Sequence, residues 1–114
     1  MSDNVISVLS TNAPSGISNS QFRRIDQVYG LAVSKNVLTY RSVQCDFDKG
    51  EMTIALAKSP NHGPIISFVA NKVGPKTTMY ELYMEKKGRI AKSALFDRVF
   101  ERYRDEVEHL IQKS

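Results

Sequence analysis

Apolar residues recur at intervals of three and four positions in two segments of the chain, one before and one after its middle. Over residues 21–33 this spacing predicts a helix, and Ser20 is a suitable residue to cap its start. A second and longer helix is expected after Ser93, its predicted N-cap. Each helix presents one apolar stripe, formed by Phe22, Ile25, Val28, Tyr29 and Ala32 in the first helix and by Phe96, Val99, Phe100, Tyr103, Val107, Leu110 and Ile111 in the second.

The segment between these helices alternates apolar and polar residues in short runs, a pattern typical of strands. Four runs fit this description, at residues 36–47, 51–58, 65–71 and 77–85. The elements together predict an α+β fold: an N-terminal helix, a four-stranded antiparallel β-meander and a long C-terminal amphipathic helix packed on the sheet. We assign this single domain to residues 21–114. Residues 1–20 are expected to form a flexible N-terminal arm that includes a short strand-like run at residues 5–9.

The pairing of neighbouring strands follows from the apolar pattern, because a sheet with one buried face needs apolar residues opposite one another. Taking Lys49 and Gly50 as a two-residue hairpin loop gives such a register for the first two strands. The facing pairs are then Phe47/Met52, Cys45/Ile54 and Val43/Leu56, and similar reasoning for the last two strands gives Phe68/Tyr80 and Ile66/Leu82. We expect all of these side chains on the core face.

The opposite face of the predicted sheet is also rich in apolar side chains. It would carry Leu38, Tyr40, Ala55, Ala57, Ile65, Val69, Met79 and Tyr83. A surface of this kind is seldom left wholly exposed to water. Three explanations remain open: the N-terminal helix covers it, a symmetric partner subunit covers it, or nucleic-acid bases stack on Tyr40 and Tyr83.

The net charge of the chain is +4, and residues 51–93 hold seven cations against three anions. The predicted register places Arg41 opposite Lys58, at the end of the sheet where the fourth strand leads into the last helix. A helix N-terminus has free N–H groups that favour anions. We therefore predict an anion or nucleic-acid site at this end, although such basic segments are often only solvated connections. The predicted phosphate contacts come from Arg41, Lys58, Lys86, Lys87, Arg89 and Lys92, with Lys35 nearby.

No recognisable catalytic, cofactor or metal motif accompanies these features. Cys45 is the one cysteine, so it cannot form an internal disulfide, and we expect it to be a small core residue. We interpret His62 as part of a turn and His109 as a surface partner of Asp105 on the last helix. Residues 46–51 lack the ligand spacing of a calcium loop. We therefore expect a protein that is not an enzyme and that needs no cofactor or metal.

The N-terminus has neither a basic start nor a long apolar run, so we expect no signal peptide, no membrane partner and a cytoplasmic setting, including that of a viral or phage protein. Four strands followed by a helix occur in several small nucleic-acid-binding folds. We predict a small, non-catalytic and homodimeric protein that binds DNA or RNA or acts as a regulator. The alternative is a protein-binding module, such as an inhibitor, adaptor or chaperone, that uses the second sheet face or the last helix.

Overall fold

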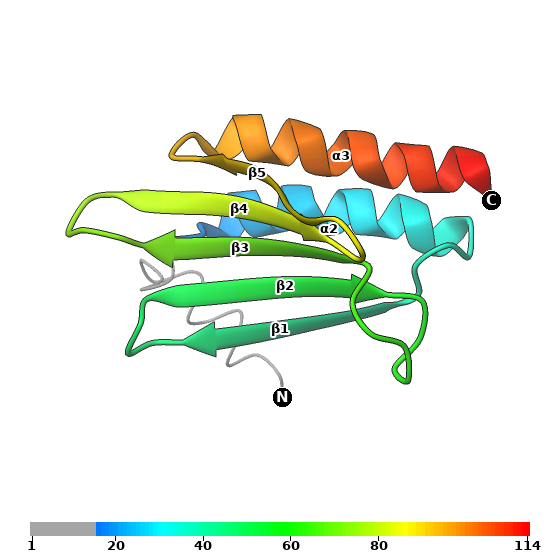
Figure 1. Cartoon of the computed structure of the whole chain (residues 1–114), viewed down its shortest axis with the longest axis horizontal. Helices are drawn as coiled ribbons and strands as arrows, with labels where there is room; N and C mark the ends of the chain where they lie inside the picture. Colours follow the sequence, from blue (N-terminus) through cyan, green and yellow to red (C-terminus); the bar gives the residue numbers. More distant parts are fainter. Residues whose placement is uncertain (1–15) are drawn as a thin grey trace.

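A computed structural model describes residues 16–114 of the chain (Figure 1). The predicted strand at residues 5–9 and most of the predicted arm lie outside the described residues. No helix in the described part of the chain is long and apolar enough to span a membrane. The elements are, in order, α2 (Asn19–Ser34), β1 (Tyr40–Asp46), β2 (Glu51–Ala57), β3 (Ile66–Lys72), β4 (Thr78–Met84), β5 (Gly88–Ser93) and α3 (Phe96–Lys113).

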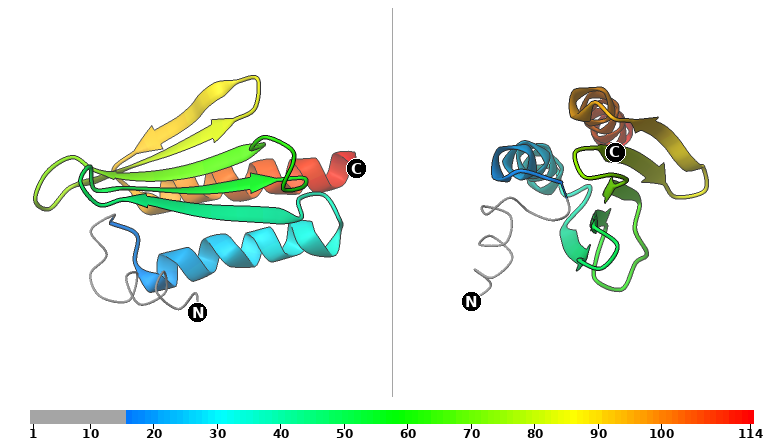
Figure 2. Two further views of the ribbon diagram at one scale, coloured as in Figure 1. Left: turned by 90° about the horizontal axis from the view of Figure 1, so that it is seen from below. Right: turned by 90° about the vertical axis from the view of Figure 1, so that its left-hand side faces the viewer.

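The five strands form one antiparallel sheet in the order β1-β2-β3-β4-β5, so each strand pairs with its neighbours in sequence. Both helices lie on the same face of this sheet and run in the same direction (Figures 1 and 2). The α+β fold with an N-terminal helix, an antiparallel sheet and a C-terminal helix is confirmed. The predicted count of four strands is wrong, because the sheet has a fifth.

The fifth strand occupies the segment that the sequence suggested to be a basic connection. A tight turn reverses the chain after β4: Lys86 and Gly88 adopt positive φ angles of 70° and 74°, and the Lys87 N–H donates to the Met84 carbonyl over 3.1 Å. β5 then pairs with β4 from Gly88 onwards. Only two residues of β5, Ile90 and Ala91, pack against the core. The apolar pattern was therefore too short to predict a strand.

The helix starts also differ from the prediction. Ser18, not Ser20, is the N-cap of α2, and it forms a capping box with Gln21. The N-cap of α3 is Leu95, which has no side-chain capping bond. The Ser93 hydroxyl accepts a hydrogen bond from the Leu95 N–H, so Ser93 fixes the turn before the helix and not the helix itself.

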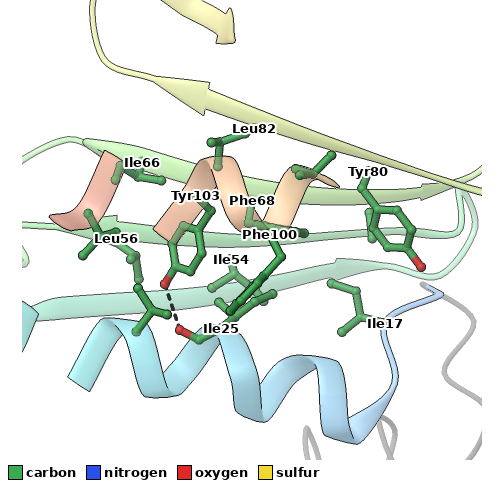
Figure 3. Packing of buried hydrophobic residues seen from close by; sticks show 14 of the residues in the cluster. Ile17, Ile25, Ile54, Leu56, Ile66, Phe68, Tyr80, Leu82, Phe100 and Tyr103 are labelled. Carbon is green, nitrogen blue, oxygen red and sulfur yellow. Dashed lines mark hydrogen bonds between the residues drawn. The ribbon is translucent and has the colours of Figure 1, made fainter. Parts of the chain in front are cut away.

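The hydrophobic core fills the space between the sheet and the two helices (Figure 3). Tyr103 of α3 is fully buried, and its hydroxyl donates to the Ile25 carbonyl of α2 over 2.8 Å. Its ring meets Phe68 of β3 edge-on, with ring centroids 5.7 Å apart. The apolar stripe predicted for α3 is confirmed, because the side chains of Phe96, Val99, Phe100, Tyr103 and Val107 are all buried.

Both predicted strand registers are wrong by two residues, although the predicted core face is right. Cys45 lies opposite Met52 and Val43 opposite Ile54, while Phe68 lies opposite Leu82. A shift of two keeps every side chain on its face, since side chains alternate with a period of two. The remaining pairs shift likewise, with Arg41 opposite Leu56, Ile66 opposite Met84 and Tyr80 opposite Ala70.

The physical reason for the first shift lies in the turn. A two-residue hairpin loop requires positive φ at both central residues (type I′) or at the first one (type II′), and here Gly50 has it (65°) whereas Lys49, the first, does not. The chain instead forms a four-residue turn, in which the Asp46 carboxylate accepts a hydrogen bond from the Lys49 N–H over 3.2 Å. Phe47 therefore leaves the sheet and is 53% exposed.

Leu38 is a further correction, because it belongs to the core and not to the second sheet face. The first strand begins at Tyr40, so the alternation of a strand does not extend back to Leu38. Asn36, with a φ of 59°, ends α2 and turns the chain, and the Val37 N–H donates to the Ala32 carbonyl. Leu38 consequently lies in the hydrophobic core.

Candidate functional site

The face of the sheet opposite the helices, here called the open face, is left uncovered by both α2 and α3 (Figure 2). This excludes the explanation in which the N-terminal helix covers it, because α2 packs beside α3 on the other face. The alternation of side chains along the strands assigns to the open face Tyr40, Ser42, Gln44, Thr53, Ala55, Ala57, Ser67, Val69, Asn71, Met79, Glu81 and Tyr83.

Small side chains form the middle of the open face near one end, and a tyrosine stands on each side of them. The register aligns Ser42, Ala55, Ser67 and Tyr83 in one row across four strands. Tyr40, on the edge strand β1, lies beside Ala57 in the neighbouring row. The tyrosines are 39% and 36% exposed, so their rings are accessible above a floor of alanine and serine.

Arg89 of β5 continues this row, because it pairs with Tyr83 in the register. Its guanidinium lies 3.9 Å from the Glu81 carboxylate, which also accepts a hydrogen bond from the Tyr83 hydroxyl. This hydrogen bond, followed by partial burial, raises the pKa of Tyr83 and keeps its hydroxyl protonated. Lys92 lies opposite Glu81 in the register. The Glu81 carboxylate therefore has two cations, Arg89 and Lys92, as its neighbours in the register.

Three exposed lysines lie at the end of the sheet where β2 and β4 finish, here called the basic end. Lys58 directly follows β2, and Lys86 and Lys87 form the turn after β4. Two hydrogen bonds bring these segments together, from the Glu85 N–H to the Ile65 carbonyl (2.9 Å) and from the Ile65 N–H to the Leu56 carbonyl (2.8 Å). None of the three lysines forms an ion pair within residues 16–114, so their charges are available to a ligand.

Arg41 does not belong to this group, which corrects the predicted site. The shifted register turns it toward the helices, where its guanidinium binds the Asp26 carboxylate of α2. It also lies over the rings of Phe22 and Tyr29, at 5.3 Å and 5.8 Å from their centroids. These contacts hold α2 against the edge of the sheet, so Arg41 has a structural role.

The start of the last helix is also absent from the basic end. β5 carries the chain back along the sheet, so α3 begins at the opposite end and finishes near the lysines (Figure 1). α2 also finishes there, with Lys35 just beyond it. Helix C-termini carry partial negative charge, and they cannot supply the free N–H groups that the sequence suggested. Lys92, near the end of β5, is farther along the open face than the three lysines.

Sequence reasoning missed two features of this site. The first is β5 itself, which places Arg89 beside Tyr83 on the same face. The available sequence signal was Gly88, which follows Lys86 and Lys87 and indicates a turn. The second is the charge at the far end of the open face, where Asp46 and Glu51 lie opposite each other beside a shallow hollow that Gln44, Cys45 and Thr53 complete. The open face is therefore polarised, with cations at one end and carboxylates at the other.

In the described part of the chain, the remaining reactive side chains do not assemble into a second site. Cys45 is half-buried at the edge of the core, and burial raises the pKa of its thiol, which disfavours the reactive thiolate. His62 is exposed, with its ring nitrogen Nδ1 within 2.9 Å of the Gly63 carbonyl. Within residues 16–114, no cluster of three or more His, Cys, Asp or Glu side chains has the arrangement of a metal site.

Comparisons of the chain with protein families, with curated proteins and with solved structures each found no match.

Proposed function

We propose that the protein binds single-stranded nucleic acid across the open face, with the basic end holding the phosphate backbone. The observation that carries this proposal is the row in which Tyr83 and Arg89 lie side by side on a sheet face that neither helix covers. Next to them are three lysines that form no ion pair with any residue from 16 to 114. Single-strand binders combine aromatic platforms for bases with cations that follow the backbone. Both components are present here on adjoining surfaces.

The dimensions of the open face suit more than one base. Tyr40 and Tyr83 are separated by three strand spacings, which is about 14 Å. The alanine and serine floor between them leaves room for planar bases to approach the sheet. Lys58, Lys86 and Lys87 then lie within reach of the phosphates at one margin, while the carboxylates of Asp46 and Glu51 at the far end disfavour them. This arrangement favours binding near the basic end.

The alternative function is a protein-binding module, which rests on the same surface. The apolar stripe of α3 is buried in the core, so this helix offers no second apolar surface to a partner. The open face, with Tyr40, Tyr83 and the half-buried Met79 among its residues, is then the surface on which an inhibitor, adaptor or chaperone would meet its partner. Catalysis has no candidate nucleophile or metal cluster in residues 16–114, and we propose a non-enzymatic role. The cytoplasmic setting and the homodimer also remain proposals.

Fluorescence anisotropy with a labelled single-stranded oligonucleotide tests the stacking component. Tyr83→Ala and Tyr40→Ala should each weaken binding by about 5-fold to 150-fold, since stacking contributes about 1–3 kcal/mol per base. Tyr83→Phe keeps the ring but removes its hydrogen bond to Glu81, and it should bind as the wild type does. Phe47→Ala, at an exposed ring away from the open face, is the matched control. Equal affinity of Tyr83→Ala and wild type would exclude base stacking at this position.

A further inference from the structure

The two edges of the sheet are built differently. β5, at one edge, has a register irregularity opposite Leu82 and Tyr83, and it carries the charged residues Arg89 and Lys92. The Arg102 guanidinium of α3 also donates to the Ile90 carbonyl over 3.3 Å. Bulges, charges and covered backbone groups are the means by which proteins prevent edge strands from pairing with other chains. The β5 edge is protected in all three ways.

β1, at the other edge, has no register irregularity, and its charged residues are limited to Arg41 and Asp46. It pairs with β2 in regular register over all seven residues, and its sequence YRSVQCD contains no lysine, proline or glycine. Its one cation, Arg41, is turned under the sheet by its ion pair with Asp26. In the part of the chain that the structure describes, no strand lies beyond β1. This edge is therefore regular in register and, within residues 16–114, has no neighbouring strand beyond it.

The backbone groups that β1 directs outward follow from two hydrogen bonds of β2. The Leu56 carbonyl accepts from Ile65, toward β3, whereas the Ala57 carbonyl accepts from Thr39, toward β1. Because these directions alternate along β2, the backbone N–H and C=O groups of Ala55 and Thr53 also point toward β1, where they face Ser42 and Gln44. The N–H and C=O groups of the alternate residues of β1 therefore point away from the sheet. These residues are Arg41, Val43 and Cys45.

We propose that a second copy of this chain pairs with this edge, β1 against β1 and antiparallel, with a two-fold axis at Val43. An axis there pairs all seven residues of β1, and any other position of the axis pairs fewer. The facing pairs are Val43 with Val43, Ser42 with Gln44, Arg41 with Cys45 and Tyr40 with Asp46, so that no two like charges are opposed. The result is a continuous sheet of ten strands, with an isologous interface.

The surface beside β1 also suits a second copy. Phe22 and Tyr29 line the flank of α2 toward β1, where Arg41 lies over both rings, and they are half-buried. Val33, one helical turn after Tyr29, is 43% exposed. The α2 helix of the partner would approach this flank across the two-fold axis and cover it. This interface uses an edge and not the open face, so the inference does not rest on the proposed function.

A disulfide at the two-fold axis tests the pairing directly. Residues in a hydrogen-bonded antiparallel pair have Cα atoms about 5.5 Å apart, a distance that a disulfide can span. In a Cys45→Ser background, Val43→Cys should form a covalent dimer on oxidation, seen on a non-reducing gel. Lys92→Cys in the same background places a thiol on the protected β5 edge and should form no covalent dimer on that gel. The wild-type Cys45 should also form no disulfide across the interface, because the Cys45 of the second copy lies four residues away from it along the strand. No covalent dimer of Val43→Cys, or an equal yield from Lys92→Cys, would overturn the inference.

Sedimentation of the full chain gives an independent test. The wild type should sediment at twice the chain mass of 12.8 kDa, and Val43→Pro at the chain mass. Proline at this position removes an outward N–H and no bond to β2, so the circular dichroism spectrum should show a folded protein. A dimeric mass for a folded Val43→Pro variant would place the contact elsewhere and overturn the inference. If Val43→Pro does not fold, the cross-linking result decides, since cysteine is tolerated at an edge position.

Discussion

The two faces of the sheet are made by the same five strands and yet have different chemistry. On the face toward the helices, side chains such as Phe68, Ile54 and Leu82 are no more than 1% exposed. On the open face, alternate positions of the same strands carry tyrosine, serine, alanine and arginine, and both tyrosines are accessible. The difference shows that the side chains on one face form the core, whereas those on the open face are not needed to fill it.

The face of the sheet toward the helices, here called the covered face, is closed by both helices together. Phe96 and Phe100 of α3 lie beneath the Arg24 guanidinium of α2, which is 4.4 Å from the Phe100 ring centroid. Arg24 also forms an ion pair with Asp97 of α3 over 2.9 Å. Arg41 and Asp26 tie α2 to β1 in the same manner. Arg24 thus joins α2 to α3, and Arg41 joins β1 to α2, at the margin of the core.

The largest effect on the free energy of unfolding is expected when a buried side chain on the covered face is truncated. Phe68→Ala should lower the free energy of unfolding by about 3–5 kcal/mol, because it leaves a cavity at the centre of the aromatic cluster. Chemical denaturation followed by circular dichroism measures this loss. Phe47→Ala is the matched control, since that ring is 53% exposed, and it should change stability by less than about 0.5 kcal/mol. Equal losses for the two variants would contradict the assignment of the core.

A smaller effect is expected from the hydroxyl of Tyr103, which joins the two helices. Tyr103→Phe removes its hydrogen bond to the Ile25 carbonyl and should lower the free energy of unfolding by about 1–2 kcal/mol. Thermal melting of the two proteins at neutral pH measures this difference. Tyr40→Phe, which changes a hydroxyl on the open face, should leave the melting temperature nearly unchanged.

Tyr103 also makes a prediction about alkaline pH. Burial first, and then the nearby Asp26 carboxylate, raises the pKa of its hydroxyl well above the usual 10.0. In the unfolded chain this tyrosine ionises near its usual pKa, whereas in the folded protein it stays neutral. The stability it contributes is therefore complete below about pH 10 and is lost as the pH rises further. Tyr103→Phe should reduce this alkaline loss in melting temperature, and an unchanged pH profile would show that other groups cause it.

The smallest effect on stability is expected at the turn between β4 and β5. Lys86 has a φ of 70°, a conformation that glycine adopts without strain. Lys86→Gly should raise the free energy of unfolding by about 0.5–1 kcal/mol, once the greater freedom of glycine in the unfolded chain is subtracted. The same change removes one of the proposed phosphate contacts, so nucleic-acid affinity should fall. A variant with a higher free energy of unfolding and a lower affinity for nucleic acid would show that one substitution affects stability and binding in opposite directions.

Apolar spacing was sufficient to predict most of the covered face, because burial imposes a strict pattern on it. The stripe of α3 from Phe96 to Val107 and the inward side chains of β2 are found where the sequence placed them. The register was less well determined, since a shift of two residues preserves the face and only the turn distinguishes the alternatives. β5 was missed because its sequence is short and mostly polar at an edge. That omission also placed the start of α3 at the wrong end.

The open face was harder to predict for a related reason. Tyr40 and Tyr83 were assigned to it correctly, because alternation alone decides the face. Arg41 was assigned to the anion site through the incorrect register, and the structure pairs it with Asp26 instead. Lys58, Lys86 and Lys87 are at one end as expected, whereas Arg89 reaches the open face only through a strand that the sequence did not reveal. Contacts between distant segments depend on the register, which polar residues do not determine.

Salt-dependent binding of a single-stranded oligonucleotide tests the central claim, that the open face and its basic end hold nucleic acid. The logarithm of the affinity should fall as the logarithm of the salt concentration rises, by about 0.7 for each phosphate contact. Replacing Lys86, Lys87 and Arg89 together by alanine should weaken binding and reduce that slope by about two units, with the fold retained. Replacing Arg98 and Arg104, on the exposed side of α3, should change neither. A wild-type protein without affinity for DNA or RNA at about 50 mM salt, or a triple variant with an unchanged slope, would contradict the account.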